Sequence, residues 1–258
     1  MTNDNNRLGR LACGAVLAVA LLVSGCASRP ANPDDPLEGF NRAMYGFNDR
    51  VDRAVLKPAA EIYEAVTPSP VRTGVGNFFS NLGDVWIGAN NILQGKVADG
   101  LSDWMRVALN STFGLAGLLD IATEAGLPKH DEDFGQTLAV WGVGEGPYVV
   151  VPFFGPRTLR DAAAIPVNMY EDDVWGIDHV RTRNSMVGLR LAHQRSRLLG
   201  LDQTLETATT DPYAYVRDFY LQQRRYKVFD GNVPVGYDDE DWMDDDEDAP
   251  AFVPSGRN

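Results

Sequence analysis

Cysteine is scarce in this chain of 258 residues, which has only Cys13 and Cys26. Both lie in an N-terminal segment with the features of a secretion signal. Cys13 would leave with that signal, and Cys26 would become the first residue of the mature chain. No disulfide can then form. In an oxidising compartment outside the cytoplasm, the fold therefore has to rest on packing alone.

The sequence also lacks the usual catalytic motifs. Its three histidines, His130, His179 and His193, do not form an HExxH pattern, so we expect no metal site. There is no G-x-S-x-G nucleophile elbow. The segment Gly95-Lys96-Val97 has no Ser or Thr after its lysine, which excludes a nucleotide-binding P-loop. We predict that the chain is not an enzyme and holds neither a cofactor nor a resident metal.

Long apolar runs and basic patches are missing beyond the N-terminal segment. No later stretch approaches 18 consecutive apolar residues, and the run Val149–Val151 is stopped by Pro152. A conventional transmembrane helix needs about 20 such residues, so none is predicted in the mature chain. No basic patch interleaved with aromatic residues is present, which argues against nucleic acid as a partner.

The N-terminus carries the most informative pattern in the chain. Arg7 and Arg10 precede the apolar run Leu11–Val23, which has the length of a signal-peptide core. Small residues then lead directly to Cys26, as at the end of a bacterial lipoprotein signal. We predict a signal peptide over residues 1–25 and acyl chains on Cys26, each buried methylene contributing about 0.8 kcal/mol to anchoring. The alternative is an ordinary secretory signal cut elsewhere.

The net charge of −13 is concentrated near the C-terminus. Nine acidic residues fall between residues 238 and 248. We predict a disordered acidic tail over residues 230–258, whose alternative role is to attract a basic partner or bind divalent cations loosely. Residues 26–34, which contain prolines and small residues, are predicted to be a tether. One large domain over residues 35–229 lies between them.

Helical signals dominate this domain. Asp35-Pro36-Leu37-Glu38 predicts a helix start capped by Asp35, and Pro58 either closes or bends that helix. Further helices are predicted from Ser69-Pro70, over residues 99–110, over 157–164 before Pro166, over 179–199, and from Asp211-Pro212 to Phe229. The segment 78–93 is apolar on all sides, which is typical of a helix that is either buried or in lipid.

Residues 134–156 form the least helical portion of the chain, because glycine and proline punctuate them heavily. Within this glycine-rich insertion, the run Tyr148–Phe154 is predicted to be a strand or one arm of an apolar hairpin. The fold class predicted from these patterns is mostly α, in a single domain of amphipathic helices with one glycine-rich hairpin insertion.

A series of short motifs follows in order along the domain: Asp35–Tyr45, Phe47-Asn48, Val71-Arg72, Asn77-Phe78, Asn81-Leu82, Asn110–Gly114, Gly117, Asp120, Phe134–Leu138, Gly142–Gly144, Gly146–Tyr148, Pro152–Gly155, Thr158–Asp161 and Asp211–Tyr213. In these motifs, from Asp35 to about Phe229, the chain resembles the MlaA/VacJ family of outer-membrane lipoproteins. The acidic tail lies outside the resemblance.

The resemblance implies helices curved into a ring around a channel within the bacterial outer membrane, associated with trimeric porins. The implied function is to remove misplaced phospholipids from the outer leaflet and to pass them to a soluble periplasmic carrier, MlaC. An inner-membrane complex driven by ATP would receive them, which agrees with the missing P-loop. We expect a lipid-anchored protein that faces the periplasm. Ala27 after the lipidated residue favours sorting to the outer membrane.

A path for phospholipid needs apolar walls for the tails and polar groups for the head. About thirty methylenes resist leaving a membrane by roughly 25 kcal/mol, and a charged head in hydrocarbon costs several kcal/mol more. We expect the insertion to control access. The residues expected along the path are Asn41, Asn48, Asn77 and Asn81 for the head, and Phe47, Phe78, Phe79, Leu82, Tyr148, Val149, Val151, Phe153 and Phe154 for the tails. Each asparagine has the alternative of capping a helix or bonding the backbone.

Two other functions remain open on the sequence alone. The chain could be a passive scaffold associated with porins that organises the envelope. It could also be an enzyme acting on lipids or envelope polymers, for which the best support would be a reactive pair such as His130 with a nearby acid.

Overall fold

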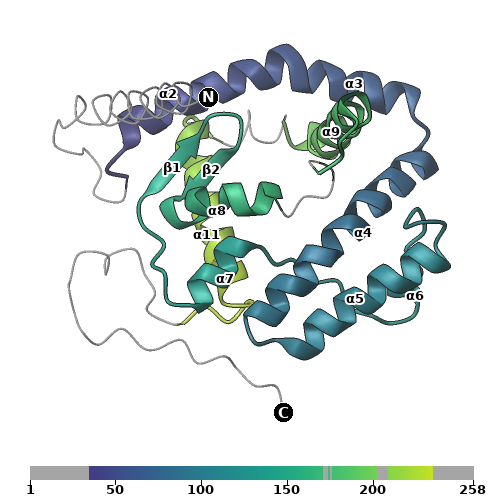
Figure 1. The fold of residues 1–258 in the computed structure, drawn as a ribbon. Helices are drawn as coiled ribbons and strands as arrows, with labels where there is room; N and C mark the ends of the chain where they lie inside the picture. The colour runs from purple at the N-terminus through teal and green to yellow at the C-terminus, as the bar shows by residue number, and fades with distance from the viewer. Residues whose placement is uncertain (1–34, 171–173, 175, 203–208, 235–258) are drawn as a thin grey trace, which may run out of the picture.

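The computed structural model describes residues 35–170, 174, 176–202 and 209–234. The predicted signal peptide, Cys26, the tether up to residue 34 and residues 235–258 of the predicted tail lie outside the described residues. Helices make up most of the described chain, which confirms the predicted fold class (Figure 1). That residues 35–229 form a single domain around a channel stays a prediction.

The first helical stretch runs from α2 (Glu38–Val51) through a π-helical segment, η1 (Asp52–Leu56), into α3 (Lys57–Val66). Pro58 does not close it, because it lies in the first turn of α3, where a missing N–H is tolerated. The π-helical turn just before it lets the helical path continue.

The predicted cap at Asp35 is wrong. Leu37 occupies the N-cap position of α2 and makes no side-chain capping bond. Asp35 is instead fully buried, where its carboxylate accepts hydrogen bonds from Asn41 Nδ2 at 2.9 Å and from the hydroxyl of Tyr213. Because Asn41 and the distant Tyr213 bind the carboxylate, it does not cap the helix.

Two antiparallel helices, α4 (Ser69–Leu93) and α5 (Val97–Thr112), form a tight hairpin, with the short α6 (Ile121–Glu124) beyond it. Close approach at this contact requires glycine at two positions. A Cβ atom on Gly88 would lie 2.7 Å from the indole of Trp104, and one on Gly100 would lie 2.7 Å from the carbonyl oxygen of Gly88. The helices predicted from Ser69-Pro70 and over residues 99–110 are thus confirmed.

The glycine-rich insertion begins with a helix, α7 (Phe134–Val140), and then forms the hairpin of β1 (Tyr148–Val151) and β2 (Gly155–Thr158). The strands are antiparallel, with Tyr148 opposite Thr158 and Val151 opposite Gly155. The prediction of a strand or hairpin arm is confirmed. The helical opening was not predicted, and it depends on Asp133, whose side chain accepts from the Gln136 N–H at 2.9 Å.

The longer helices that follow in the described residues are α8 (Leu159–Tyr170), α9 (Val180–Ser196) and α11 (Pro212–Val228), with further helical residues at 199–202. Asp211 caps α11 as the sequence predicts, by accepting from the Ala214 N–H at 3.3 Å. The predicted end of α8 before Pro166 is wrong. A proline inside a helix removes one backbone hydrogen bond, and here the helix continues past that loss to Tyr170.

The elements contact one another in a closed circuit. α2 packs on β1, which packs on α8; α8 then contacts α7, α7 contacts α4, and α4 contacts α9. α9 packs on α3, which leads back through η1 to α2 (Figure 1). The largest buried apolar cluster is small, with Tyr148, Val150 and Tyr213 at its centre. Because this cluster is small, segments far apart in the sequence are held together mainly by the contacts around the circuit.

Candidate functional site

Two pockets lie inside this circuit and share two lining residues, Asp133 and Asn168. The first has a volume of about 310 Å³ and extends along α4. The second has a volume of about 260 Å³ and lies between β2, α8 and α11. They are therefore adjacent; the first has large apolar side chains of α4 on one wall and the second is lined mostly by charged and polar side chains, and we call them the apolar half and the polar half of the site.

The apolar half is one face of α4. Phe79, Leu82, Gly83, Trp86 and Ile87 recur at the three- and four-residue spacings of a single helical stripe. The other face of α4 packs against α5, with Asp84 and Gly88 buried there. The two faces of segment 78–93 therefore differ: the buried residues of α4 are polar or glycine, whereas large apolar side chains line the pocket.

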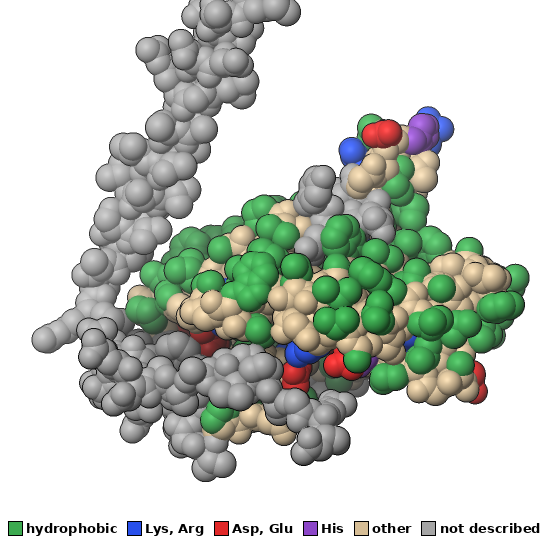
Figure 2. Space-filling view, turned by 60° about the horizontal axis from the view of Figure 1, so that its bottom comes forward, with side chains coloured by type: hydrophobic (Ala, Val, Ile, Leu, Met, Phe, Trp, Pro, Cys, Tyr) green, Lys and Arg blue, Asp and Glu red, His purple; other side chains and the backbone are tan. Residues whose placement is uncertain are grey.

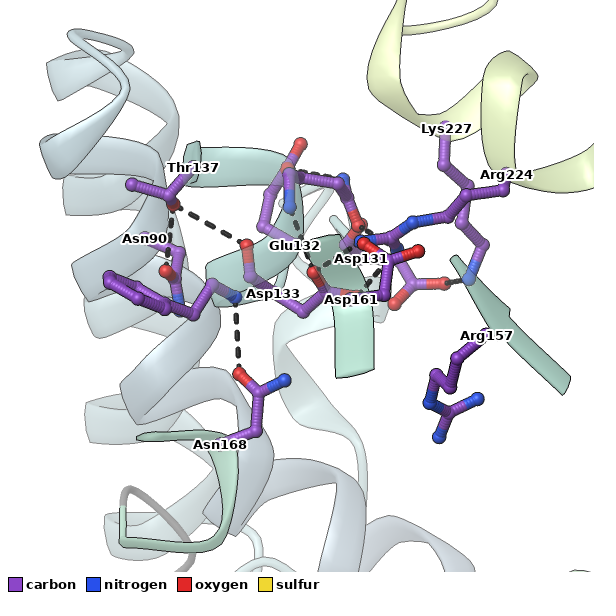
Figure 3. Close-up of polar contacts among 12 residues, drawn as sticks. Asn90, Asp131, Glu132, Asp133, Thr137, Arg157, Asp161, Asn168, Arg224 and Lys227 are labelled. Atoms are coloured by element: carbon purple, nitrogen blue, oxygen red, sulfur yellow. Dashed lines mark hydrogen bonds and ion pairs between the residues drawn. The ribbon is translucent and has the colours of Figure 1, made fainter. Parts of the chain in front are cut away.

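The polar half is built around Arg224 of α11. Its Nη1 lies 2.6 Å from Asp133 Oδ2 and its Nη2 lies 2.7 Å from Asp161 Oδ1 (Figure 3). Lys227, one turn further along α11, lies 2.6 Å from Asp131. Tyr220 donates to the second oxygen of Asp161 at 2.7 Å. A single helix thus ties the loop before α7 to the start of α8.

Charge and burial oppose each other in this cluster. Burial acts to raise the pKa of Asp133, but the hydrogen bonds and charge of Arg224 outweigh it, so its pKa lies below the usual range. Glu132 next to it behaves differently. Burial raises its pKa, although Gln94 and Lys96 donate to it at 2.9 and 3.1 Å. The site therefore combines a firmly ionised carboxylate with one that binds a proton more readily.

Two of the residues expected on a lipid path, Phe79 and Leu82, do line the apolar pocket. Phe78 lies beside Phe79, with ring centroids 5.4 Å apart. Asn77 and Asn81 lie on the side of α4 that faces the segment from α5 to α6. They donate to the Leu118 carbonyl oxygen at 3.1 Å and to Ser111 Oγ at 3.0 Å. Neither asparagine is among the residues that line the pockets.

The other expected path residues gather at the β-hairpin and are not among the residues that line the two pockets. The amides of Asn41 and Asn48 bond its backbone: Asn41 contacts Tyr148 and Val150, and Asn48 contacts Val151 and Phe153. Tyr148 is buried, whereas Val149 and Val151 alternate onto the half-buried face of β1. At the hairpin tip Phe153 is 73% exposed and Phe154 42%, and the Phe47 ring lies 5.2 Å from that of Phe153. The part of each residue in a lipid path stays a proposal.

Sequence reasoning missed the polar half of the site. Asp133, Asp161 and Arg224 come from three separate segments, and nothing local marks them as partners. Asp161 lies within the motif Thr158–Asp161, and Asp133 directly precedes the motif Phe134–Leu138. Acidic residues at the edges of such motifs were the available signal.

His130 does lie beside an acid, as the enzyme alternative requires. Its Nδ1 is 2.8 Å from Oδ1 of the fully buried Asp103, whose other oxygen accepts from Asn91 at 2.8 Å. His130 Nε2 is 3.7 Å from Asp99. Neither His130 nor Asp103 lines the two pockets. These contacts hold the loop before α7 against helix α5.

The outer surface carries many large apolar side chains. Figure 2 shows them gathered over the face in view. None of the helices in the described residues has both the length and the hydropathy to cross a membrane. Examples of large apolar side chains that are exposed by about half or more are Val55, Ile62, Val66, Val71, Val97, Leu101, Met105, Phe113, Leu115 and Trp141. An exposed apolar surface of this extent is typical of a protein that contacts a membrane or another protein.

Comparison with known proteins points to one family. The family model described as MlaA lipoprotein matches residues 33–227. Proteins named intermembrane phospholipid transport system lipoprotein MlaA, from Shigella flexneri and Escherichia coli K12, are each 37% identical over 238 residues, covering 88% of this chain and 90% of the relative. The protein of that name from Haemophilus influenzae is 31% identical, covering 84% of this chain and 90% of the relative.

A solved structure agrees with these relatives. It is described as the structural basis for maintenance of bacterial outer membrane lipid asymmetry, and it superposes with a TM-score of 0.65 at 34% identity. The superposition covers 75% of this chain and 98% of the solved one. Because the family model spans most of the chain and the relatives match it almost end to end, the chain belongs to the MlaA lipoprotein family.

Proposed function

We propose that this protein removes mislocalised phospholipids from the outer leaflet of the bacterial outer membrane and passes them to a periplasmic carrier, thereby maintaining lipid asymmetry. The observation that supports this proposal is the two-part site, in which an apolar pocket along α4 adjoins a polar pocket at α11. Relatives named for intermembrane phospholipid transport support it.

The physical requirement for such transfer is a path that suits both ends of the lipid. Each methylene that leaves the membrane costs about 0.8 kcal/mol unless it meets another apolar surface, which Phe79, Leu82, Trp86 and Ile87 offer here. A charged headgroup in hydrocarbon costs several kcal/mol unless polar groups receive it. The ion pairs around Arg224 offer such an environment next to the apolar wall.

The exposed apolar side chains suit the outside of the protein to contact with the membrane. They allow the helices to lie in the membrane without crossing it. Acyl chains on Cys26 hold the mature protein to the outer membrane, facing the periplasm. In this arrangement the helices curve into a ring around a channel, a trimeric porin is the membrane partner, and the periplasmic lipid carrier collects the lipid.

The experiment that tests this function measures acylation of lipid A in intact cells, which reports phospholipid in the outer leaflet. Deletion of the gene should raise the signal, and the full chain should restore it. Cys26→Ala should leave a soluble, mislocalised protein that fails to restore it. An unchanged signal after deletion would contradict the proposal. If the wild-type protein crosslinks to porin, but lipid asymmetry stays at the wild-type level after deletion of the gene, the chain is a passive scaffold.

A further inference from the structure

Arg157 is a cation in the polar pocket for which the described part of the chain provides no carboxylate partner. It lies on β2 opposite Val149 and lines the pocket together with Tyr220 and Gln223. Its Nη1 donates to the carbonyl oxygen of Pro156 at 2.8 Å. Within the described residues, no acid lies within ion-pair distance of its guanidinium, and Figure 3 draws no contact from it to the neighbouring acids.

The two other cations that line this pocket differ from Arg157, because both are paired. Arg224 lies between Asp133 and Asp161, and Lys227 pairs with Asp131. Two carboxylates and three cations line the pocket, and Arg224 contacts both carboxylates. Counting Asp131, three carboxylates and three cations meet here, so the formal charge is balanced, and Arg157 is the one of these cations that no acid of the described residues contacts.

A guanidinium of this kind is suited to phosphate. Arginine presents five N–H donors in a planar fork that matches phosphate oxygens, and it stays charged at any physiological pH. The pairing of Arg157 with Val149 in the hairpin fixes its backbone on a strand, and a binding group on a strand is held more precisely than one on a loop.

The location also fits the head of a phospholipid. The polar pocket has a volume of about 260 Å³, just below the range of roughly 300–1,000 Å³ for sites that hold whole small molecules. It shares the lining residues Asp133 and Asn168 with the pocket along α4. A lipid with its tails along that wall would place its headgroup, the one part that needs polar contacts, in the smaller pocket.

We propose that Arg157 binds the phosphate of a glycerophospholipid held in the two-part site. This inference rests on the proposed function, and it adds the contact by which the protein distinguishes a phosphate-bearing lipid from a neutral lipid with the same tails. Arg157 contributes charge and directed donors at the head end, while the tails gain only the non-directional burial that α4 provides.

The test compares two tail-labelled lipids with identical acyl chains, phosphatidylglycerol and diacylglycerol, binding to the purified full-length chain in detergent. Arg157→Leu should weaken binding of phosphatidylglycerol about tenfold and leave diacylglycerol binding unchanged, because a hydrogen-bonded charge contributes on this scale. Arg157→Lys should give an intermediate affinity, since it keeps the charge but loses the fork. The matched control is Arg50→Leu, the same change at an exposed arginine of α2, which should bind like the wild type.

Each outcome is decisive. Equal phosphatidylglycerol affinity in Arg157→Leu and wild type, with both lipids bound, overturns the inference and leaves the proposed function standing. If 10-fold excess inorganic phosphate abolishes the preference for phosphatidylglycerol, the site is one for free phosphate and the inference is wrong. Failure of the wild type and of Arg50→Leu to bind either lipid overturns both proposals. If the thermal unfolding midpoints of Arg157→Leu and of the milder variant Arg157→Lys equal that of the wild type, misfolding is excluded as the cause of a loss of binding.

Discussion

Gly135 lies directly against the guanidinium of Arg224: a Cβ atom on Gly135 would be 2.5 Å from Arg224 Nη2 and 2.4 Å from Asp161 Oδ1. Real Cβ atoms do not approach other atoms so closely. The first residues of α7 can therefore reach α11 and α8 only because a side chain is absent at this position. The polar half of the site depends on that contact.

Gly135→Ala should consequently disturb the ion pairs of Arg224 and lower the free energy of unfolding by about 1–3 kcal/mol, as overpacking of a well-packed site does. Denaturant titration of the purified chain measures the change. Gly144→Ala is the matched control, because Gly144 has no atom within 4 Å of its added Cβ and its φ is not positive. Equal stability of both variants would show that the contact at Gly135 relaxes without cost.

Arg224→Gln tests the electrostatics of the same cluster. The pKa of Asp133 lies below its usual value, so its ion pair stabilises the fold above pH 4 and this stabilisation is lost as the pH falls further. Without Arg224, its hydrogen bonds and charge no longer offset burial, so the pKa of Asp133 rises. The variant should be less stable by about 3–5 kcal/mol at pH 7, mainly because the buried carboxylate of Asp161 loses its arginine, while Asp133, with a side chain that is 39% exposed, contributes less.

The difference between wild type and Arg224→Gln should then shrink as the pH is lowered from 7 towards 4, because protonation relieves the unpaired acids in the variant. Denaturation at several pH values checks this. Arg50→Gln, a change at an exposed arginine outside the cluster, should show the same pH dependence as the wild type. A difference that stays constant with pH would mean that Arg224 contributes packing rather than charge.

Which features the sequence predicts depends on how local their causes are. The start of α11 is predictable, because the capping side chain of Asp211 and the amide it bonds are three residues apart. The role of Asp35 is not, since its partner Tyr213 is 178 residues away. The cluster around Arg224 is not predictable for the same reason, because Asp133 lies 91 residues from it. Local chemistry thus predicts most of the helices, although the equally local cap of Asp133 at the start of α7 was missed. The polar half of the site forms only after the chain closes on itself.

Asn41 offers a test of how the β-hairpin is held. Its Nδ2 donates to the Tyr148 carbonyl oxygen at 3.0 Å and its Oδ1 accepts from the Val150 N–H at 2.8 Å, so it bonds β1 as a neighbouring strand would. Asn41→Leu leaves both backbone groups buried and unpaired, at about 1–3 kcal/mol each. The Val150 amide should exchange with solvent much faster in this variant. In Asn77→Leu, which removes an exposed bond to Leu118, its protection should be unchanged.

The apolar pocket is tested by Leu82→Gln, which places an amide on the wall that we propose receives acyl chains. Burying a leucine side chain contributes about 1.5–3 kcal/mol, so losing that contact should reduce lipid removal by roughly tenfold or more. Lipid A acylation in cells with matched protein levels measures the effect. Leu93→Gln makes the same change on α4 at a side chain that is 46% exposed and outside the pocket. If the two variants reduce lipid removal equally, the face of α4 at Leu82 does not carry the lipid.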